Sequence, residues 1–211
     1  YEYAATVDTI GGRSEAGLEW ADKGIELASE LGVENVSRHL QMRGLARLDL
    51  GEPAGIEDLR QALDVGLHLG LGFETASAYN NLAEIVLARE SIEAGLALHD
   101  ASLDYARRRA MTHHEMWTRM SRFLPLYELG EWDELLCESD EVLEWDRGQG
   151  TTQISSGVLR FRACVHAQRL DLEGIVAKRK RDPYSRQTVW YKIKSRTYTQ
   201  GEGRWELFQR R

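Results

Sequence analysis

The residues best suited to chemistry lie near the end of the 211-residue chain, where positive charge collects. Residues 170–211 contain 11 Lys and Arg against 5 Asp and Glu, a net charge of +6, whereas residues 1–169 carry −13. The run Trp-Tyr-Lys-Ile-Lys at 190–194 predicts a short strand. Because side chains alternate along a strand, Lys192 and Lys194 would share one face. A cationic face of this kind favours an anionic ligand, such as a nucleotide or nucleic acid.

Two phrases in this basic segment resemble motifs of a known enzyme family. The phrase E-G-I-V-A-K at 173–178 is followed by W-Y-K-I-K at 190–194. Together they resemble nucleotidyltransferase motifs IV and V of ATP-dependent DNA ligases. The resemblance implies that Glu173 would bind a divalent metal, Mg²⁺. It also implies a nucleotide-binding set for ATP, consisting of Lys178, Lys192 and Lys194, in which the last two would contact the α-phosphate.

The same resemblance makes the missing nucleophile conspicuous. Such ligases transfer AMP from ATP to the lysine of a K-x-D-G motif, and these 211 residues contain no such motif. Of the five lysines, only Lys23 precedes the basic segment, and it lies in a predicted repeat helix. We therefore expect no catalytic residue and no autonomous ligase activity. ATP and Mg²⁺ would be needed only if the segment works with a separate chain that carries the nucleophile.

The elements that must position these residues are mostly helical. Apolar residues recur at spacings of three and four, and glycines stand where helices should end, at Gly32, Gly51, Gly70 and Gly130. The pattern predicts helices at about 14–31, 35–50, 53–69, 74–89, 92–109, 113–129, 132–146 and 152–168.

These helices form an internal repeat. Equivalent positions follow one another at 38, 40 and 39 residues, and they are Leu18, Ile56, Leu96 and Leu135. A period near 39 with two helices per unit predicts a helical solenoid, because one helix pair cannot bury its apolar face alone. A small residue lies two positions before three of these residues and should allow the helices to approach closely. These small residues are Ala16, Ala54 and Ala94.

The array resembles tetratricopeptide repeats, although its period exceeds the usual ~34 residues. The phrases R-G-L-A-R-L-D-L-G at 43–51 and A-Y-N-N-L-A at 78–83 are similar to arrays that trail bacterial nucleotide cyclases and large ATPase-type transcriptional regulators. The predicted fold class is predominantly α: a tetratricopeptide-like helix-pair solenoid over 1–168, then a short β-containing C-terminal tail over 170–211. The resemblance implies a scaffold that binds a protein or peptide on its concave face and needs no cofactor.

Three functions stay open at this point. The first is protein-interaction scaffolding by the repeats. The second is an ATP-dependent DNA ligase-like protein, which seals nicks through lysyl-AMP only with a nucleophile-bearing chain. The third is a fused or misjoined gene product without a selected function, which the charge break and the truncated ligase-like segment both fit.

The amino-acid composition indicates the class of protein and its expected location. Hydrophobic residues make up 42% and charged residues 29%, which is ordinary for a soluble protein. No run of 18 apolar residues and no signal-peptide pattern occurs, so we predict a cytoplasmic protein without a membrane partner. Cys137 and Cys164 fit no metal-ligand spacing. The chain lacks an initiator Met, which is typical of a fragment.

The histidines and tryptophans are expected to have structural roles. His113 and His114 are adjacent and cannot share a helix face, so we expect a surface pair rather than a metal site. His68 and His99 should face grooves or solvent. Core packing is expected for the tryptophans at repeat spacing or helix ends, which are Trp20, Trp117, Trp132 and Trp145. The alternative is that one of them lines a peptide-binding groove.

Overall fold

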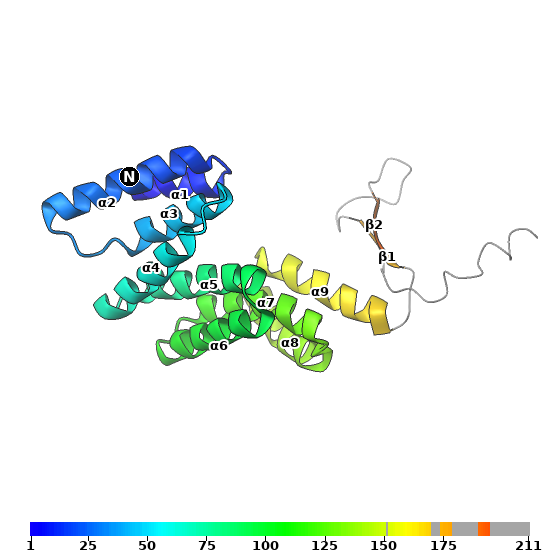
Figure 1. The fold of residues 1–211 in the computed structure, drawn as a ribbon. Helices are drawn as coiled ribbons and strands as arrows, with labels where there is room; N and C mark the ends of the chain where they lie inside the picture. Colours follow the sequence, from blue (N-terminus) through cyan, green and yellow to red (C-terminus); the bar gives the residue numbers. More distant parts are fainter. Residues whose placement is uncertain (151, 170–173, 179–189, 195–211) are drawn as a thin grey trace, which may run out of the picture. The chain divides into compact units, whose positions relative to one another are not determined.

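The computed structural model describes residues 1–150, 152–169, 174–178 and 190–194. Over these ranges the chain forms nine helices and two strands (Figure 1). The helices are α1 (Glu2–Ile10), α2 (Ser14–Leu31), α3 (Ser37–Asp49), α4 (Gly55–Leu69), α5 (Gly72–Arg89), α6 (Ile92–Arg108), α7 (Thr112–Leu129), α8 (Trp132–Gly148) and α9 (Ile154–Arg169). The strands are β1 (Gly174–Lys178) and β2 (Trp190–Lys194), which pair antiparallel with Ile175 opposite Ile193.

The predicted helices are confirmed, with boundaries that differ by at most two residues. Gly32 and Gly70 end α2 and α4 in the left-handed conformation, each with φ of 67°, which a residue without Cβ adopts at little cost. Helix α1 was not predicted. It is only nine residues long, its first residue Glu2 follows a Tyr1 that provides no side-chain cap, and only Ala5 is buried. A helix this short has no sustained apolar period for sequence analysis to detect.

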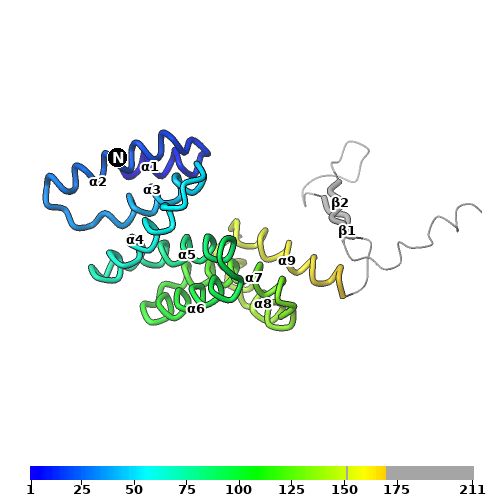
Figure 2. The backbone as a smooth tube through the Cα atoms, in the orientation of Figure 1, coloured from blue at the N-terminus to red at the C-terminus, as the bar shows by residue number. Residues whose placement is uncertain are grey.

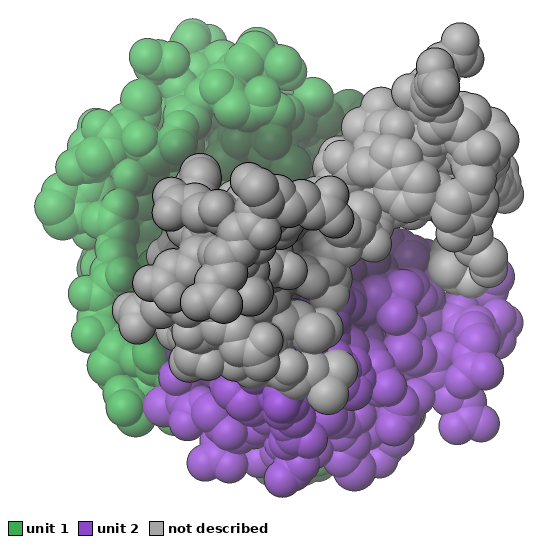
Figure 3. Space-filling model, turned by 90° about the vertical axis from the view of Figure 1, so that its right-hand side faces the viewer, with its two compact units in different colours: residues 1–125 green, residues 126–211 purple. Residues whose placement is uncertain are grey.

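The chain divides into two compact units, residues 1–125 and 126–211, which Figure 3 distinguishes by colour. The division falls at Pro125, which lies inside α7. A proline in a helix interior lacks the N–H for the i−4 hydrogen bond and its ring clashes with that carbonyl. Helix α7 continues through this position, but its hydrogen-bond ladder lacks the bond that the Pro125 nitrogen cannot donate.

Unit 1 is a succession of antiparallel helix hairpins (Figures 1 and 2). Each helix from α1 to α5 packs against the next helix in the chain. Helix α1 also contacts α3, and α3 contacts α5, so these three helices lie beside one another as one layer. This is the packing of stacked helix pairs that the repeat period predicts.

The glycines of the repeat phrases set the crossings within each hairpin. A Cβ atom at Gly55 would lie 2.3 Å from the Gly44 carbonyl oxygen, and one at Gly95 would lie 2.7 Å from Leu87 Cα. At Gly17 the nearest backbone atom, Thr9 N, would be 2.9 Å away. The expected close approach of the helices is present. The contact position is the glycine of each repeat phrase, however, and not the alanine that precedes it. Ala54, for example, is exposed.

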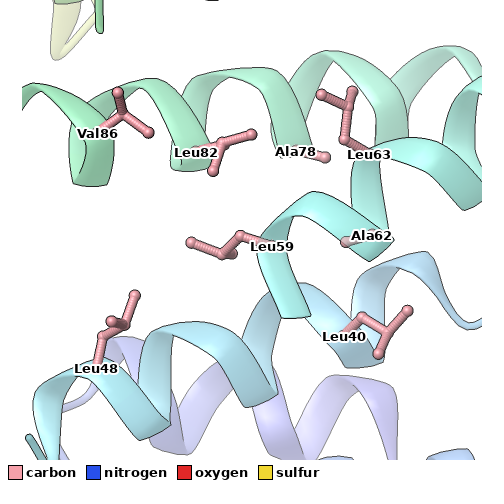
Figure 4. Close-up of a cluster of buried hydrophobic side chains, with 8 residues drawn as sticks. All are labelled: Leu40, Leu48, Leu59, Ala62, Leu63, Ala78, Leu82 and Val86. Carbon is pink, nitrogen blue, oxygen red and sulfur yellow. The ribbon is translucent and has the colours of Figure 1, made fainter. Parts of the chain in front are cut away.

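The core of unit 1 lies between α3, α4 and α5 (Figure 4). Leu59 points from α4 towards both neighbours and is 0% exposed. Leu40 of α3 and Leu82 of α5 are nearly as deeply buried. Each such side chain contributes about 1.5 to 3 kcal/mol by leaving water, and together these leucines hold α3 and α5 at fixed positions.

In unit 2, helices α8 and α9 pack together, and a buried carboxylate links them. Asp146, near the end of α8, accepts hydrogen bonds from the Thr152 backbone N–H at 3.0 Å and from the Ser155 hydroxyl. It thereby provides a partner for an N–H group just before α9. Burial raises the pKa of Asp146, but the hydrogen bonds from Ser155 and Thr152 together lower it by more. The pKa of Asp146 is therefore below its ordinary value.

We expect Asp146→Ala to destabilise unit 2 by about 2 kcal/mol, because two hydroxyls and an N–H lose a charged acceptor. The lowered pKa means that this contribution is present at neutral pH and is lost as acid protonates the carboxylate. Chemical denaturation of the wild type and Asp146→Ala at pH 7 measures the difference. Glu144→Ala is the control, since Glu144 is an exposed acid on the same helix. Equal losses for the two variants would contradict the capping role.

Candidate functional site

A groove of about 280 Å³ opens on the odd-numbered helices of unit 1. We call it the α3/α5/α7 groove. Its polar and charged lining residues are Arg38, Ser77, Asn80, Asn81, His113 and His114. Its apolar and aromatic lining residues are Ile10, Met42, Leu45, Phe73 and Trp117.

Helical spacing explains how three helices build one surface. Residues 38, 42 and 45 of α3 follow at i, i+4 and i+7, and so do residues 73, 77 and 80 of α5. Residues 113 and 117 lie one turn apart on α7. Residues at these spacings project from one face of a helix. Since α3 packs beside α5, two such faces are adjacent, and the third is contributed by α7.

Arg38 provides the permanent charge among the groove-lining residues. Its Nη1 donates to the Ser77 hydroxyl at 3.1 Å, which links α3 to α5. Burial lowers the pKa of the Arg38 guanidinium, while the charges of Glu2 and Glu74 act to raise it. The guanidinium stays protonated at any physiological pH. Within the described ranges, no carboxylate lies within ion-pair distance of Arg38.

A hydrogen-bonded network holds the floor of the groove. The Asn81 amide donates to Gln41 Oε1 at 3.0 Å. The Gln41 amide in turn donates to the Glu74 carbonyl at 3.1 Å, and the Ser37 hydroxyl donates to the Ala62 carbonyl at 2.8 Å. Gln41 and Ser37 are fully buried. Because buried polar groups are costly to leave unpaired, this network fixes α3, α4 and α5 against one another.

Aromatic rings form one wall. The rings of Phe73 and His114 meet edge to face with centroids 5.0 Å apart, and His113 lies 6.1 Å from His114. Burial lowers the pKa of His114, and the charge of His113 lowers it further. Both histidines line the groove. His113 is exposed, as expected of a surface pair, whereas His114 is half-buried. Trp117 also lines the groove and is half-buried, which fits the alternative expected for one tryptophan rather than a place in the core.

His99 lies outside the groove and was misplaced by the sequence analysis. It is 0% exposed, where a groove or solvent position was expected. Its Nε2 lies 3.8 Å from Glu84 Oε1 of α5. Burial lowers the pKa of His99 to about 4, and the Arg122 charge contributes to this shift.

The residues of the ligase-like phrases lie partly within the described ranges. Lys178 ends β1, opposite Trp190, and Lys192 and Lys194 of β2 lie opposite Val176 and Gly174. Glu173 is outside the described residues. The nucleotide and metal roles that the resemblance implies for these four residues stay predictions. In the part of the chain that the structure describes, no group of three or more His, Cys, Asp and Glu could hold a metal ion.

Comparison with solved structures bears on the fold. The chain resembles the crystal structure of a Signal Transduction ATPase with Numerous Domains (STAND) protein with a tetratricopeptide repeat sensor from Pyrococcus horikoshii, with a TM-score of 0.58 and 12% identity. The match covers 82% of this chain. The fold is a tetratricopeptide-like helical array. The chain spans 30% of that protein's length, and at this identity the likeness concerns the fold alone.

No family model and no curated protein matches the chain. The ligase-like interpretation of residues 170–211 therefore rests on its two phrases. Among the described helices, none is long and apolar enough to cross a membrane.

Proposed function

We propose that unit 1 is a protein-interaction module that binds an extended peptide segment in the α3/α5/α7 groove. The observation that carries this proposal is the composition of the groove, in which a cation and amides line the same concavity as aromatic and aliphatic side chains. Binding sites commonly combine an apolar lining with a few polar groups that fix orientation.

The framework under the groove supports this proposal. The leucine core and the Gln41 network hold α3 and α5 rigidly, so little ordering is required when a ligand binds. Phe73 is 58% exposed, although it stands within a binding-sized concavity. An exposed aromatic ring next to polar side chains favours a ligand that has both apolar and polar parts, as peptides have.

Selection from a random peptide phage library tests the proposal. We expect the wild type to enrich a family of related sequences. Ser77→Trp, which fills the groove, should abolish binding of the enriched peptides. Glu93→Trp on α6, an exposed position outside the groove lining, is the control and should leave binding unchanged. Enrichment of peptides that bind Ser77→Trp as well as the wild type would place the site elsewhere.

For residues 170–211 we propose that the ligase-like phrases do not support adenylation by this chain alone, because its 211 residues contain no K-x-D-G lysine. Incubation with α-labelled ATP and Mg²⁺ should leave no label on the denatured chain. If label is retained and Lys192→Ala or Glu173→Ala removes it, the segment uses another nucleophile and this proposal is wrong. Addition of a nucleophile-bearing ligase fragment tests whether the segment completes a second chain.

A further inference from the structure

Arg38 differs from the other arginines of its helix in having no carboxylate of the described residues within ion-pair distance. Arg43 and Arg47, also on α3, both pair with the buried Asp58, at 2.6 and 2.7 Å. Arg38 has only the neutral Ser77 hydroxyl as a hydrogen-bond acceptor among the described residues. A guanidinium carries five N–H donors in a planar fork that matches a carboxylate. The groove therefore presents a half-buried cation whose best partner is absent from this part of the chain.

Asn80 adds an unpaired acceptor on the same helix face as Ser77. Its Oδ1 atom is buried and accepts no hydrogen bond from any described residue. Its neighbour Asn81, by contrast, is engaged with Gln41. Residues three apart on a helix have Cβ atoms about 5 to 6 Å apart, so Asn80 lies one turn from the Ser77 that holds Arg38. A ligand that satisfies both groups must offer an anion and, close to it, an N–H donor.

We infer that the peptide bound in the α3/α5/α7 groove carries an Asp or Glu, whose carboxylate pairs with Arg38 while a backbone N–H of the same segment donates to Asn80 Oδ1. This inference rests on the proposed function and specifies its ligand. An apolar residue next to the acidic one would contact Phe73 and Trp117. Since residues 1–169 carry a net charge of −13, a polyanion is disfavoured, and one carboxylate is expected rather than an acidic run.

A positional-scanning library of acetylated, amidated nonapeptides tests this inference by fluorescence anisotropy. Fixing Asp or Glu at one position should raise affinity about tenfold over Asn or Gln at that position, as expected for a charge-assisted contact. A second acidic residue should add nothing. Arg38→Gln should remove the preference for the acid, and Arg38→Lys should restore part of it.

Arg60→Gln is the matched control. Arg60 is an exposed arginine of α4, and its replacement should leave the acid preference intact. The midpoint temperature of thermal unfolding is measured for Arg38→Gln, and a value equal to that of the wild type shows that the variant keeps the fold. If peptides bind but Asp and Glu give no advantage, or if Arg38→Gln keeps the advantage, the inference is overturned while peptide binding stands. If no library member binds the wild type, the proposed function and the inference both fail.

Discussion

Gly55→Ala should destabilise unit 1 by about 2 to 3 kcal/mol, although alanine is normally the better helix former by about 1 kcal/mol. The new Cβ would lie 2.3 Å from the Gly44 carbonyl oxygen and 2.8 Å from Leu48 Cγ. The first of these is a backbone atom, so α3 and α4 must move apart and the leucine core between them must loosen. Chemical denaturation monitored by circular dichroism measures the loss.

The control for this substitution is Gly72→Ala, at the start of α5. There a Cβ would meet only the Met111 side chain, with Sδ at 3.6 Å and Cε at 3.9 Å, which is ordinary van der Waals contact. Gly72→Ala should therefore be neutral or slightly stabilising, since alanine restricts the unfolded chain. If Gly55→Ala proved as stable as Gly72→Ala, the glycine of the repeat phrase would not set the helix crossing, and our account of the period would be wrong.

The second large effect concerns His99. Both ring nitrogens are buried and have no hydrogen-bond partner among the described residues. His99→Leu removes these unsatisfied atoms at similar volume, so we expect it to stabilise unit 1 by about 1 to 2 kcal/mol at pH 7. Urea denaturation of the wild type and His99→Leu at the same pH gives the difference directly.

The difference should grow as the solution becomes acidic. The folded-state pKa of His99 is about 4 against an ordinary value of 6.5, so the unfolded chain takes up the proton first. The free energy of unfolding is therefore not reduced by His99 protonation above pH 6.5, and it decreases as the pH falls towards 4. Full loss amounts to about 3 kcal/mol, at 1.36 kcal/mol per pKa unit. His99→Leu should therefore gain this additional advantage by pH 4.

Neighbouring groups must be separated from this effect. Burial raises the pKa of Glu84, while a hydrogen bond with Ser121 lowers it, and the net upward shift makes the folded state more stable in acid. Because Glu84 is present in both proteins, subtraction of the two pH profiles removes its contribution to first order. His68→Leu, at an exposed histidine of α4, is the control. A parallel pH profile for the wild type and His99→Leu would contradict the assignment.

The repeat period predicted the helices because it reflects a simple physical requirement: each pair must bury the same stripe against its neighbours. Gly17, Gly55 and Gly95 recur because the hairpin crossing recurs. Sequence analysis failed where that requirement is absent. Helix α1 buries only Ala5, so it lacks the apolar stripe that marks the later helices.

The groove was missed for a different reason. All its residues except Ile10 come from α3, α5 and α7, and only the packing of these helices reveals which faces adjoin. A signal was nevertheless present on α5, where Phe73, Ser77 and Asn80 follow at i, i+4 and i+7. His99 was similarly traceable, because it lies four residues after the crossing glycine Gly95 and so on the same buried face. Neither pattern shows that a buried polar atom lacks a partner, since that depends on three-dimensional contacts.

The central claim is that peptide binds across the odd-numbered helices of unit 1, and hydrogen–deuterium exchange with a library-selected peptide tests it most directly. Bound peptide should slow amide exchange only in residues 37–49, 72–89 and 112–125. The exchange rates of α4 and α6 should not change. The Arg38→Gln protein should show this protection only at higher peptide concentration. Protection of α4 and α6 with none on α3, α5 or α7 would place the partner on the opposite side of the hairpins and contradict the account.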